Sequence, residues 1–171
     1  MSELGSLALR LAEATDIPTA AERLAEHLQT LVPDAAARVY LLGPGDKCGA
    51  CPRAELCNAR ERCFHLEAGL GAFARPAMLD QRVPIEDSAW ASVHDGGSEA
   101  APTEMPEELR GPNDGEGEDA PGFLLLPLEA GGETVGVLGV RFPEEHRETV
   151  ASEARVGAFL TATAIRLLRS L

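Results

Sequence analysis

The segment that most restricts how this chain folds is GFLLLPLEAGGETVGVLGVRF, residues 122–142. Its two apolar runs flank the tetrapeptide AGGE. Apolar runs on either side of a short glycine turn are typical of an antiparallel β-hairpin. Pro143 follows directly and ends the second strand. The chain is therefore expected to contain an antiparallel sheet.

Apolar residues at helical spacing predict helices on both sides of this hairpin in the chain. We expect helices over 3–14, about 18–31 and about 144–170, a short helix near 88–94, and further strands over 36–43 and 63–73. The last helix has one apolar stripe, formed by Val150, Ala154, Gly157, Leu160, Ala164, Leu168 and Leu171. Val156, Phe159 and Leu167 widen that stripe, which indicates a surface for a partner. The predicted fold class is α+β, with terminal helices packed on one face of the sheet.

The composition favours a cytoplasmic protein with a single domain over 1–171. Apolar residues make up 44% of the 171 residues, enough for a hydrophobic core. The first residues lack the basic start and unbroken apolar run of a signal peptide, and no apolar segment has the length of a membrane span. The net charge of −13 argues against direct nucleic-acid binding, which requires a basic surface.

All four cysteines lie in KCGACPRAELCNARERCFH, residues 47–65. In a cytoplasmic protein, clustered cysteines indicate a metal site or redox chemistry more than structural disulfides. The predicted metal ligands are Cys48, Cys51, Cys57 and Cys63, within a cysteine-rich insertion over 44–64. Four basic residues lie among them and would offset the negative charge of thiolates: Lys47, Arg53, Arg60 and Arg62.

The spacing C-x2-C-x5-C-x5-C leaves the metal open. Two C-x2-C pairs are typical of structural zinc, whereas one such pair with wider steps favours an iron–sulfur cluster, most often 4Fe–4S. Zinc is the alternative, and a metal-free thiol or disulfide pair is the third. Cys57 and Cys63 would face different directions on one helix, so the chain is expected to turn near Asn58. His65 is a strand histidine that could assist as a substitute ligand or donor, and a purely structural metal is as well supported as a sensing one.

The segment over 95–120 is acidic and rich in glycine and proline, with nine carboxylates and one arginine between 95 and 119. It is predicted to be a flexible loop. Trp90 and His94 precede it, and both are candidate ligand-binding residues for a pocket below it. His27 and His146 are expected on the surface. No catalytic motif is present, so the chain is not predicted to be an enzyme.

Three segments of the sequence resemble the GAF domain family. They are ARVYLLGPGD at 37–46, VPIEDSAWASV at 83–93, and the hairpin with the helix after it; together they span most of the chain. The resemblance implies a central antiparallel sheet with the N- and C-terminal helices on one face and loops and short helices on the other. It also implies a sensory role and a C-terminal helix that dimerises. Some members attached to bacterial transcriptional regulators carry a comparable cysteine-rich insert.

Other functions of the family do not transfer to this chain. It lacks the signature of cyclic-nucleotide GAF domains, the late cysteine of bilin-binding members, and the NW…GFY segment of members that reduce free methionine sulfoxide. The interpretation is a regulatory GAF-like module whose iron–sulfur cluster senses redox state, oxygen or nitric oxide. It would act as a homodimer and signal to a kinase or transcriptional regulator. A small-molecule-binding module with structural zinc is the alternative, and a thiol-based reductase is the third.

Overall fold

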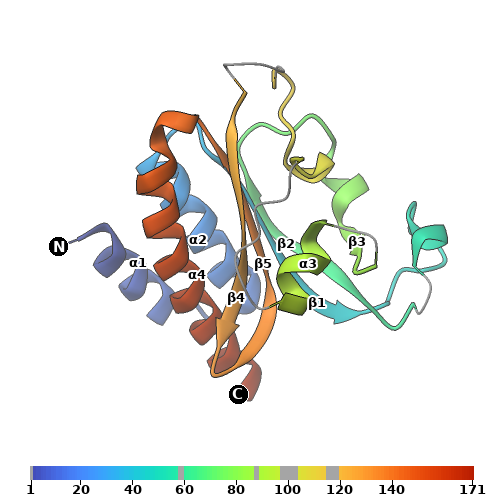
Figure 1. Cartoon of the computed structure of the whole chain (residues 1–171). Coiled ribbons are helices and arrows are strands. Elements are labelled where there is room, and N and C mark those ends of the chain that lie inside the picture. Colours follow the sequence, from blue (N-terminus) through green and yellow to red (C-terminus); the bar gives the residue numbers. More distant parts are fainter. Residues whose placement is uncertain (1, 58–59, 87–88, 97–103, 115–119) are drawn as a thin grey trace.

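A five-stranded antiparallel sheet with the strand order β3-β2-β1-β5-β4 forms the centre of the molecule (Figure 1). The computed structural model describes residues 2–57, 60–86, 89–96, 104–114 and 120–171. The strands are β1 (Ala36–Pro44), β2 (Arg62–Leu70), β3 (Arg82–Pro84), β4 (Gly122–Ala130) and β5 (Glu133–Phe142). β2 returns antiparallel beside β1, so the cysteine-rich insertion is the connection between two neighbouring strands.

The predicted hairpin is confirmed as β4 and β5, which pair from Gly122↔Phe142 to Ala130↔Glu133. Gly131 and Gly132 make the turn with φ values of 61° and 76°. Backbone in this left-handed region strains residues that carry a Cβ, which explains the glycine pair. The hairpin thus contributes the strand next to β1 and one edge of the sheet.

Three helices cover one face of the sheet: α1 (Glu3–Ala12), α2 (Ile17–Leu31) and α4 (Arg147–Ser170) (Figure 1). Side-chain caps start the first two, because Ser2 accepts from the Gly5 amide and Asp16 from the Thr19 amide. The apolar faces of these helices and of the sheet form the larger core. The predicted α+β architecture is therefore confirmed, with the terminal helices on one face.

The opposite face carries α3 (Ala89–Gly96) and three short 3₁₀ turns: η1 (Ala54–Leu56), η2 (Ala77–Asp80) and η3 (Glu107–Leu109). A fourth 3₁₀ turn, η4 (Glu144–His146), leads into α4. A second, smaller core lies here, in which Trp90 of α3 packs against Tyr40 of β1 with ring centroids 4.8 Å apart. Leu109 of η3 is fully buried in the same core. The described part of the acidic segment, 104–114, is thus anchored to the sheet, while 97–103 and 115–119 lie outside the described residues.

His27 and His146 were both expected at the surface. His146 is exposed as expected, but the expectation for His27 is wrong: it is buried between α2 and α4, and its Nε2 lies 3.0 Å from the Glu153 carboxylate.

Along α4, Val156, Phe159 and Leu167 remain exposed. Among the described residues, no helix combines the length and the apolar character needed to cross a membrane.

Candidate metal centre

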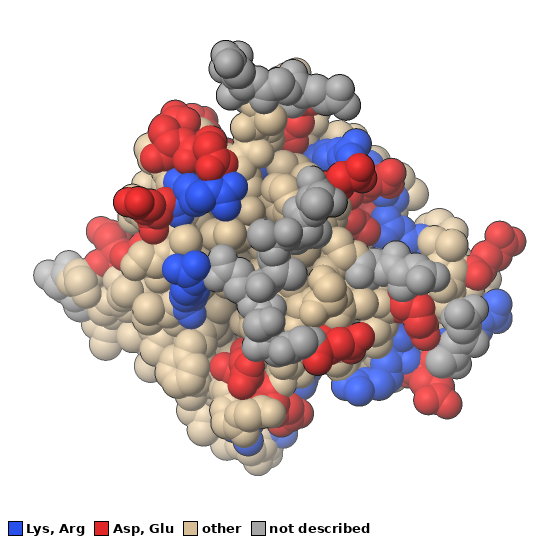
Figure 2. Space-filling view, in the orientation of Figure 1, with Lys and Arg blue, Asp and Glu red and all other residues tan. Residues whose placement is uncertain are grey.

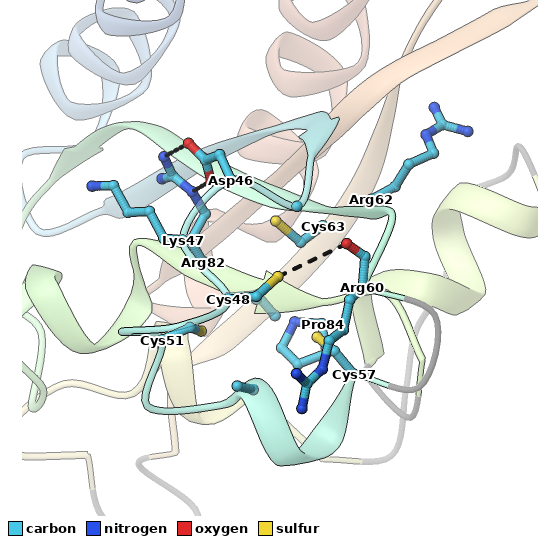
Figure 3. A pocket seen from close by; sticks show the side chains of 13 residues that line it. Asp46, Lys47, Cys48, Cys51, Cys57, Arg60, Arg62, Cys63, Arg82 and Pro84 are labelled. Atoms are coloured by element: carbon cyan, nitrogen blue, oxygen red, sulfur yellow. Dashed lines mark hydrogen bonds and ion pairs between the residues drawn. The ribbon is translucent and has the colours of Figure 1, made fainter.

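The four cysteines converge on one small cavity at the end of β1 and β2 (Figure 3). Cys63 is the second residue of β2, where it pairs with Gly43 of β1 and Pro84 of β3. The other three cysteines lie in the connection between β1 and β2, which folds back over the strand ends. The cavity that all four line has a volume of about 20 Å³. Residues up to 15 positions apart in sequence are thereby brought to one place.

Close backbone contacts hold the two ends of this connection together. The Gly45 amide donates to the Glu61 carbonyl at 2.9 Å, which extends the pairing of β1 and β2 by one bond. Arg60 has a φ of 55°, so the left-handed residue that turns the chain is Arg60; Asn58, where the turn was expected, lies outside the described residues. A Cβ on Gly45 would stand 2.1 Å from the Arg60 carbonyl oxygen and 3.2 Å from the Cys48 sulfur. Only glycine therefore permits this closure.

An exposed ion pair joins the cysteine-rich segment between β1 and β2 to β3. The Arg82 guanidinium donates from Nε and Nη2 to the two carboxylate oxygens of Asp46, at 2.8 and 2.9 Å (Figure 3). This hydrogen bonding by Arg82 holds the pKa of the Asp46 carboxyl well below its usual range. Arg82 also lines the cysteine cavity. The pair fixes the chain two residues before Cys48.

The geometry around the thiols constrains which metal group would fit. Within the described residues, the only three ligand atoms found within 4.8 Å of one another belong to Asp46, Cys63 and His65, so no three of the four sulfurs are that close. Sulfurs around a tetrahedral zinc stand ~3.8 Å apart, given Zn–S bonds of ~2.3 Å. The thiols thus surround the cavity more widely than a single zinc requires. Conversely, a cavity of about 20 Å³ is too small for a cluster unless the connection moves outward.

Four thiols are a donor set for a metal group, but two of them have raised pKa values. Burial raises the pKa of the Cys63 thiol to about 11 despite the nearby Arg82 cation, and burial also raises the pKa of the Cys57 thiol. Both thiols are protonated at neutral pH, so a metal would have to displace their protons on binding.

His65 lies close to Asp46 and Cys63 but does not line the cysteine cavity. Its Nε2 lies 2.8 Å from the Pro44 carbonyl oxygen, which can only accept, so the Nε2–H donates. The imidazole covers Gly43, where a Cβ would stand 2.8 Å from the ring. Nε2 is 3.8 Å from the Asp46 carboxylate, which is already paired with Arg82. These contacts engage Nε2 and favour a positioning role for His65 over metal ligation.

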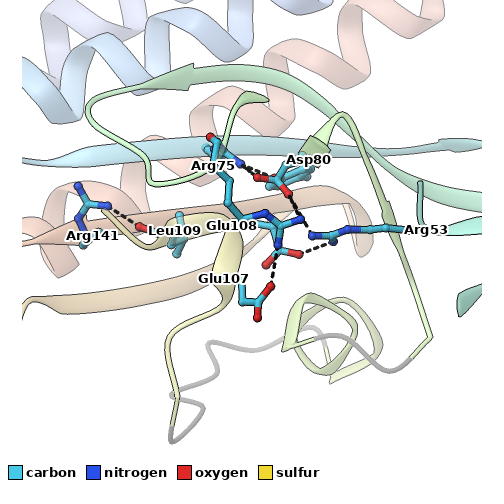
Figure 4. Close-up of polar contacts among 9 residues, drawn as sticks. Arg53, Arg75, Asp80, Glu107, Glu108, Leu109 and Arg141 are labelled. Atoms are coloured by element: carbon cyan, nitrogen blue, oxygen red, sulfur yellow. Dashed lines mark hydrogen bonds and ion pairs between the residues drawn. The ribbon is translucent and has the colours of Figure 1, made fainter. Parts of the chain in front are cut away.

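The basic residues of the insertion divide into two groups. Lys47, Arg60 and Arg62 line the cysteine cavity, as the charge argument predicts. Arg53 does not: its guanidinium pairs with Asp80 and Glu108 instead (Figure 4). Arg82 lines the cavity in its place, and nothing in the sequence around it indicated this position. Figure 2 shows that acidic and basic side chains alternate around the edge where the insertion projects, so this edge is less uniformly acidic than the net charge suggests.

A second, larger cavity of about 480 Å³ lies between α3, β3, η3 and the insertion. Trp90 lines it, whereas His94 packs its ring edge-on against Phe64 at 5.9 Å. Among the described residues, Glu86 Oε2 and Trp90 Nε1 are buried without a hydrogen-bond partner of normal geometry. Trp90 Nε1–H does lie close enough to the Glu108 carboxylate to contribute to lowering its pKa. Glu86 and Trp90 both line this cavity, and Glu86 Oε2 is a buried acceptor without a partner in the described part of the chain.

The fold matches those of solved sensory and enzymatic proteins at low sequence identity. The GAF domain of a phosphoenolpyruvate-protein phosphotransferase from Acinetobacter superposes with a TM-score of 0.68 at 14% identity, covering 100% of this chain and 98% of that one. Free methionine-R-sulfoxide reductase from Neisseria meningitidis, in complex with its substrate, gives 0.65 at 15%, covering 98% and 88%. The GAF domain of the potassium sensor histidine kinase from Escherichia coli gives 0.56 at 17%, covering 98% and 94%.

Sequence comparison alone does not reach this assignment, since no protein-family model and no curated protein matches the chain. At identities of 14 to 17%, the structural likeness establishes the fold and leaves activity open. The central antiparallel sheet, the layer of terminal helices and the short helices on the opposite face agree with the expectation from the sequence motifs. The chain has the fold of a GAF domain.

Proposed function

We propose that this chain is a sensory GAF-fold module in which Cys48, Cys51, Cys57 and Cys63 bind an iron–sulfur cluster. The observation that carries the proposal is the convergence of all four thiols on one cavity, with Lys47, Arg60, Arg62 and Arg82 around it. Four thiols are the donor set of a 4Fe–4S cluster, and basic neighbours offset its net negative charge. The sulfurs are separated more widely than zinc needs, which supports the cluster over the single ion, and the connection would move outward to admit it.

The proposed signal is redox state, oxygen or nitric oxide, and the position of the insertion explains how it would spread. Bound here, a cluster would supply a centre whose integrity depends on oxidants. The chain's own residues would transmit a change in the insertion. Cys63 is part of β2, and the Asp46–Arg82 pair joins the insertion to β3. A rearranged insertion would therefore alter this edge of the sheet and the surface offered to a regulatory partner such as a kinase or transcriptional regulator.

The test is anaerobic purification followed by absorption spectroscopy and measurement of iron, sulfide and zinc per chain. We expect a brown protein that contains iron and sulfide and bleaches in air. Single Cys→Ser changes at the four positions should each lower the iron content several-fold, because every ligand is needed to hold the group. Colourless protein without iron, folded equally well in all four serine variants, would refute the cluster and leave the cysteines without a metal role.

A homodimer through the terminal helices is part of the proposal. Val156, Phe159 and Leu167 form an exposed apolar stripe on α4, and Phe159 is 57% exposed. Burying this stripe against a second copy would remove it from water. We expect Phe159→Glu to raise the dimer dissociation constant at least tenfold in sedimentation experiments. Met78→Glu is the matched control, since Met78 is 70% exposed but lies on η2, away from the stripe.

The second candidate is a small-molecule-binding module with a structural zinc. The 480 Å³ cavity, lined by Trp90 and by Glu86 with its unpaired Oε2, favours it. A protein that contains one zinc, is stabilised against heat by a metabolite and does not respond to oxidant would support this function. The tryptophan fluorescence should then change on ligand binding, because Trp90 is the only tryptophan in the chain.

A further inference from the structure

Arg53 connects the cysteine-rich insertion to the wall of the second cavity. It lies two residues after Cys51, and its Nη1 stands 2.5 Å from Glu108 Oε1 while its Nη2 stands 3.0 Å from Asp80 Oδ1. Both carboxylates are nearly removed from water, with residue exposures of 7% for Glu108 and 0% for Asp80. Charged hydrogen bonds in such surroundings are stronger than those on the surface.

Asp80 joins further elements to this connection (Figure 4). Its carboxylate also pairs with Arg38 of β1 at 2.5 Å and with Arg75 at 3.2 Å. Arg75 in turn pairs with Glu107, the residue before Glu108 on η3. One group of charges therefore links the insertion, the central strand β1, η2 and η3.

Arg53 is the member of this charged group that belongs to the insertion, so its ion pairs depend on where the insertion lies. On its other side, η3 is held by Arg141, which donates to the Leu109 carbonyl. Asp80 keeps Arg38 and Arg75 when Arg53 is withdrawn. Glu108 has no such reserve among the ion pairs of the described residues, because its salt bridge is with Arg53. Loss of the Arg53 contact would consequently leave a buried carboxylate next to Trp90 without its cation.

We infer that Arg53 couples the conformation of the cysteine-rich insertion to that of η3 and the second cavity. The trigger, gain or loss of a metal group at the thiols, rests on the proposed function; the coupling itself rests on the ion pairs. When the insertion shifts, Glu108 loses Arg53, and η3 moves or opens to hydrate the carboxylate. The effect must be reciprocal, because a free-energy coupling between two sites acts equally in both directions.

The first experiment tests the coupling in the reverse direction and without any metal. In chelator-treated, reduced protein, we would measure the rate at which iodoacetamide alkylates Cys51 and Cys57, by mass spectrometry. Glu108→Gln removes the charge that holds Arg53 while keeping the side-chain shape, and should raise the rate at least about fivefold. Glu107→Gln is the matched control, since Glu107 lies on the same turn but is paired with Arg75. In this variant the two cysteines should be alkylated at the wild-type rate. Equal rates in all three proteins would overturn the inference.

The second experiment tests the forward direction by hydrogen exchange of the amides over 104–110. In the wild type, the metal-loaded protein should exchange there about fivefold or more faster than the chelator-treated protein, because admitting the group moves the connection outward and withdraws Arg53 from Glu108. Arg53→Ala should exchange fast with and without metal. Arg23→Ala, which removes a cation on α2 that is 39% exposed and lines neither cavity, should respond like the wild type. A protein that never holds metal refutes the proposed function, while the alkylation rates still decide the coupling. A metal-loaded wild type whose exchange over 104–110 ignores the chelator refutes the coupling alone.

Discussion

Arg38 and Asp80 form an ion pair that is almost completely removed from water, although one lies on the central strand and the other 42 residues later on η2. Arg38 Nη1 stands 2.5 Å from Asp80 Oδ2, and the two side chains are 1% and 0% exposed. The Arg38 guanidinium also stacks over the Phe73 ring, 4.0 Å from its centroid. The buried positive charge of Arg38 on the central strand is thus neutralised by the carboxylate of Asp80 on η2.

Removing the Asp80 charge should destabilise the fold strongly. Asp80→Asn leaves Arg38 buried without its counter-charge, and we expect the free energy of unfolding to fall by about 3–5 kcal/mol. Urea denaturation measures this directly. Glu26→Gln is the control, because Glu26 pairs with Arg23 at 2.9 Å on a surface where both side chains are 39% exposed. That change should cost less than about 1 kcal/mol; a similar loss in both variants would contradict the structure.

Closure of the cysteine-rich insertion should depend on one glycine and not on its neighbour. Gly45→Ala places a Cβ 2.1 Å from the Arg60 carbonyl, which forces the two ends of the insertion apart. We expect this variant to lose most of its bound metal, measured per chain after anaerobic purification. Gly49→Ala should keep wild-type metal content, because no atom lies within 4 Å of a Cβ at Gly49. Equal metal content in the two variants would show that the closure seen here is not needed for binding.

The packing of Trp90 on β5 predicts a suppressible defect. A Cβ on Gly139 would stand 2.3 Å from Cη2 and 2.6 Å from Cζ3 of the indole. Gly139→Ala should therefore lower the free energy of unfolding by about 1–3 kcal/mol through overpacking. Phenylalanine at position 90 lacks the outer ring atoms, so adding Trp90→Phe to Gly139→Ala should cost less than it does in the wild type. Additive losses in a double-mutant cycle would argue against this contact.

The Glu108 carboxylate predicts a pH-dependent contribution to stability. Burial alone would raise its pKa, but the hydrogen bond and charge of Arg53, together with hydrogen bonds from the backbone and from Trp90, hold the pKa below the usual 4.5. A lowered pKa in the folded state stabilises the protein above the unfolded-state pKa, and the gain disappears as pH falls through the folded-state value. The unfolding free energy of Glu108→Gln should thus fall short of the wild type by a constant amount above about pH 5.

Below that pH the difference should narrow, which urea midpoints at about pH 7 and about pH 3.5 would reveal. Glu107→Gln serves again as control, since Glu107 is 70% exposed and should show little difference at either pH. A gap between Glu108→Gln and wild type that widens on acidification would mean that Arg53 does not stabilise the ionised carboxylate.

Local patterns in the sequence determined the secondary structure and the presence of a thiol cluster. The glycine turn of the hairpin and the apolar spacing of α2 and α4 follow from short-range patterns, which record the face that each element buries. The cysteines are close in sequence, so their meeting at one cavity needed no long-range information. The resemblance of three segments to GAF domains predicted how these elements are arranged, and the structure has that fold.

The tertiary structure alone decided the charged contacts and which polar residues are buried. Arg53 was expected beside the thiols but pairs with Glu108, 55 residues later; Asp46 finds Arg82, 36 residues later. His27 was expected at the surface and is buried against Glu153, because α4 packs over it. Pairings across such distances are set by how whole elements pack, since any arginine in a flexible segment can reach several carboxylates before the fold selects one. The periodicity of a single helix or strand records burial against the sheet, but it does not record the partner that a later segment brings to it.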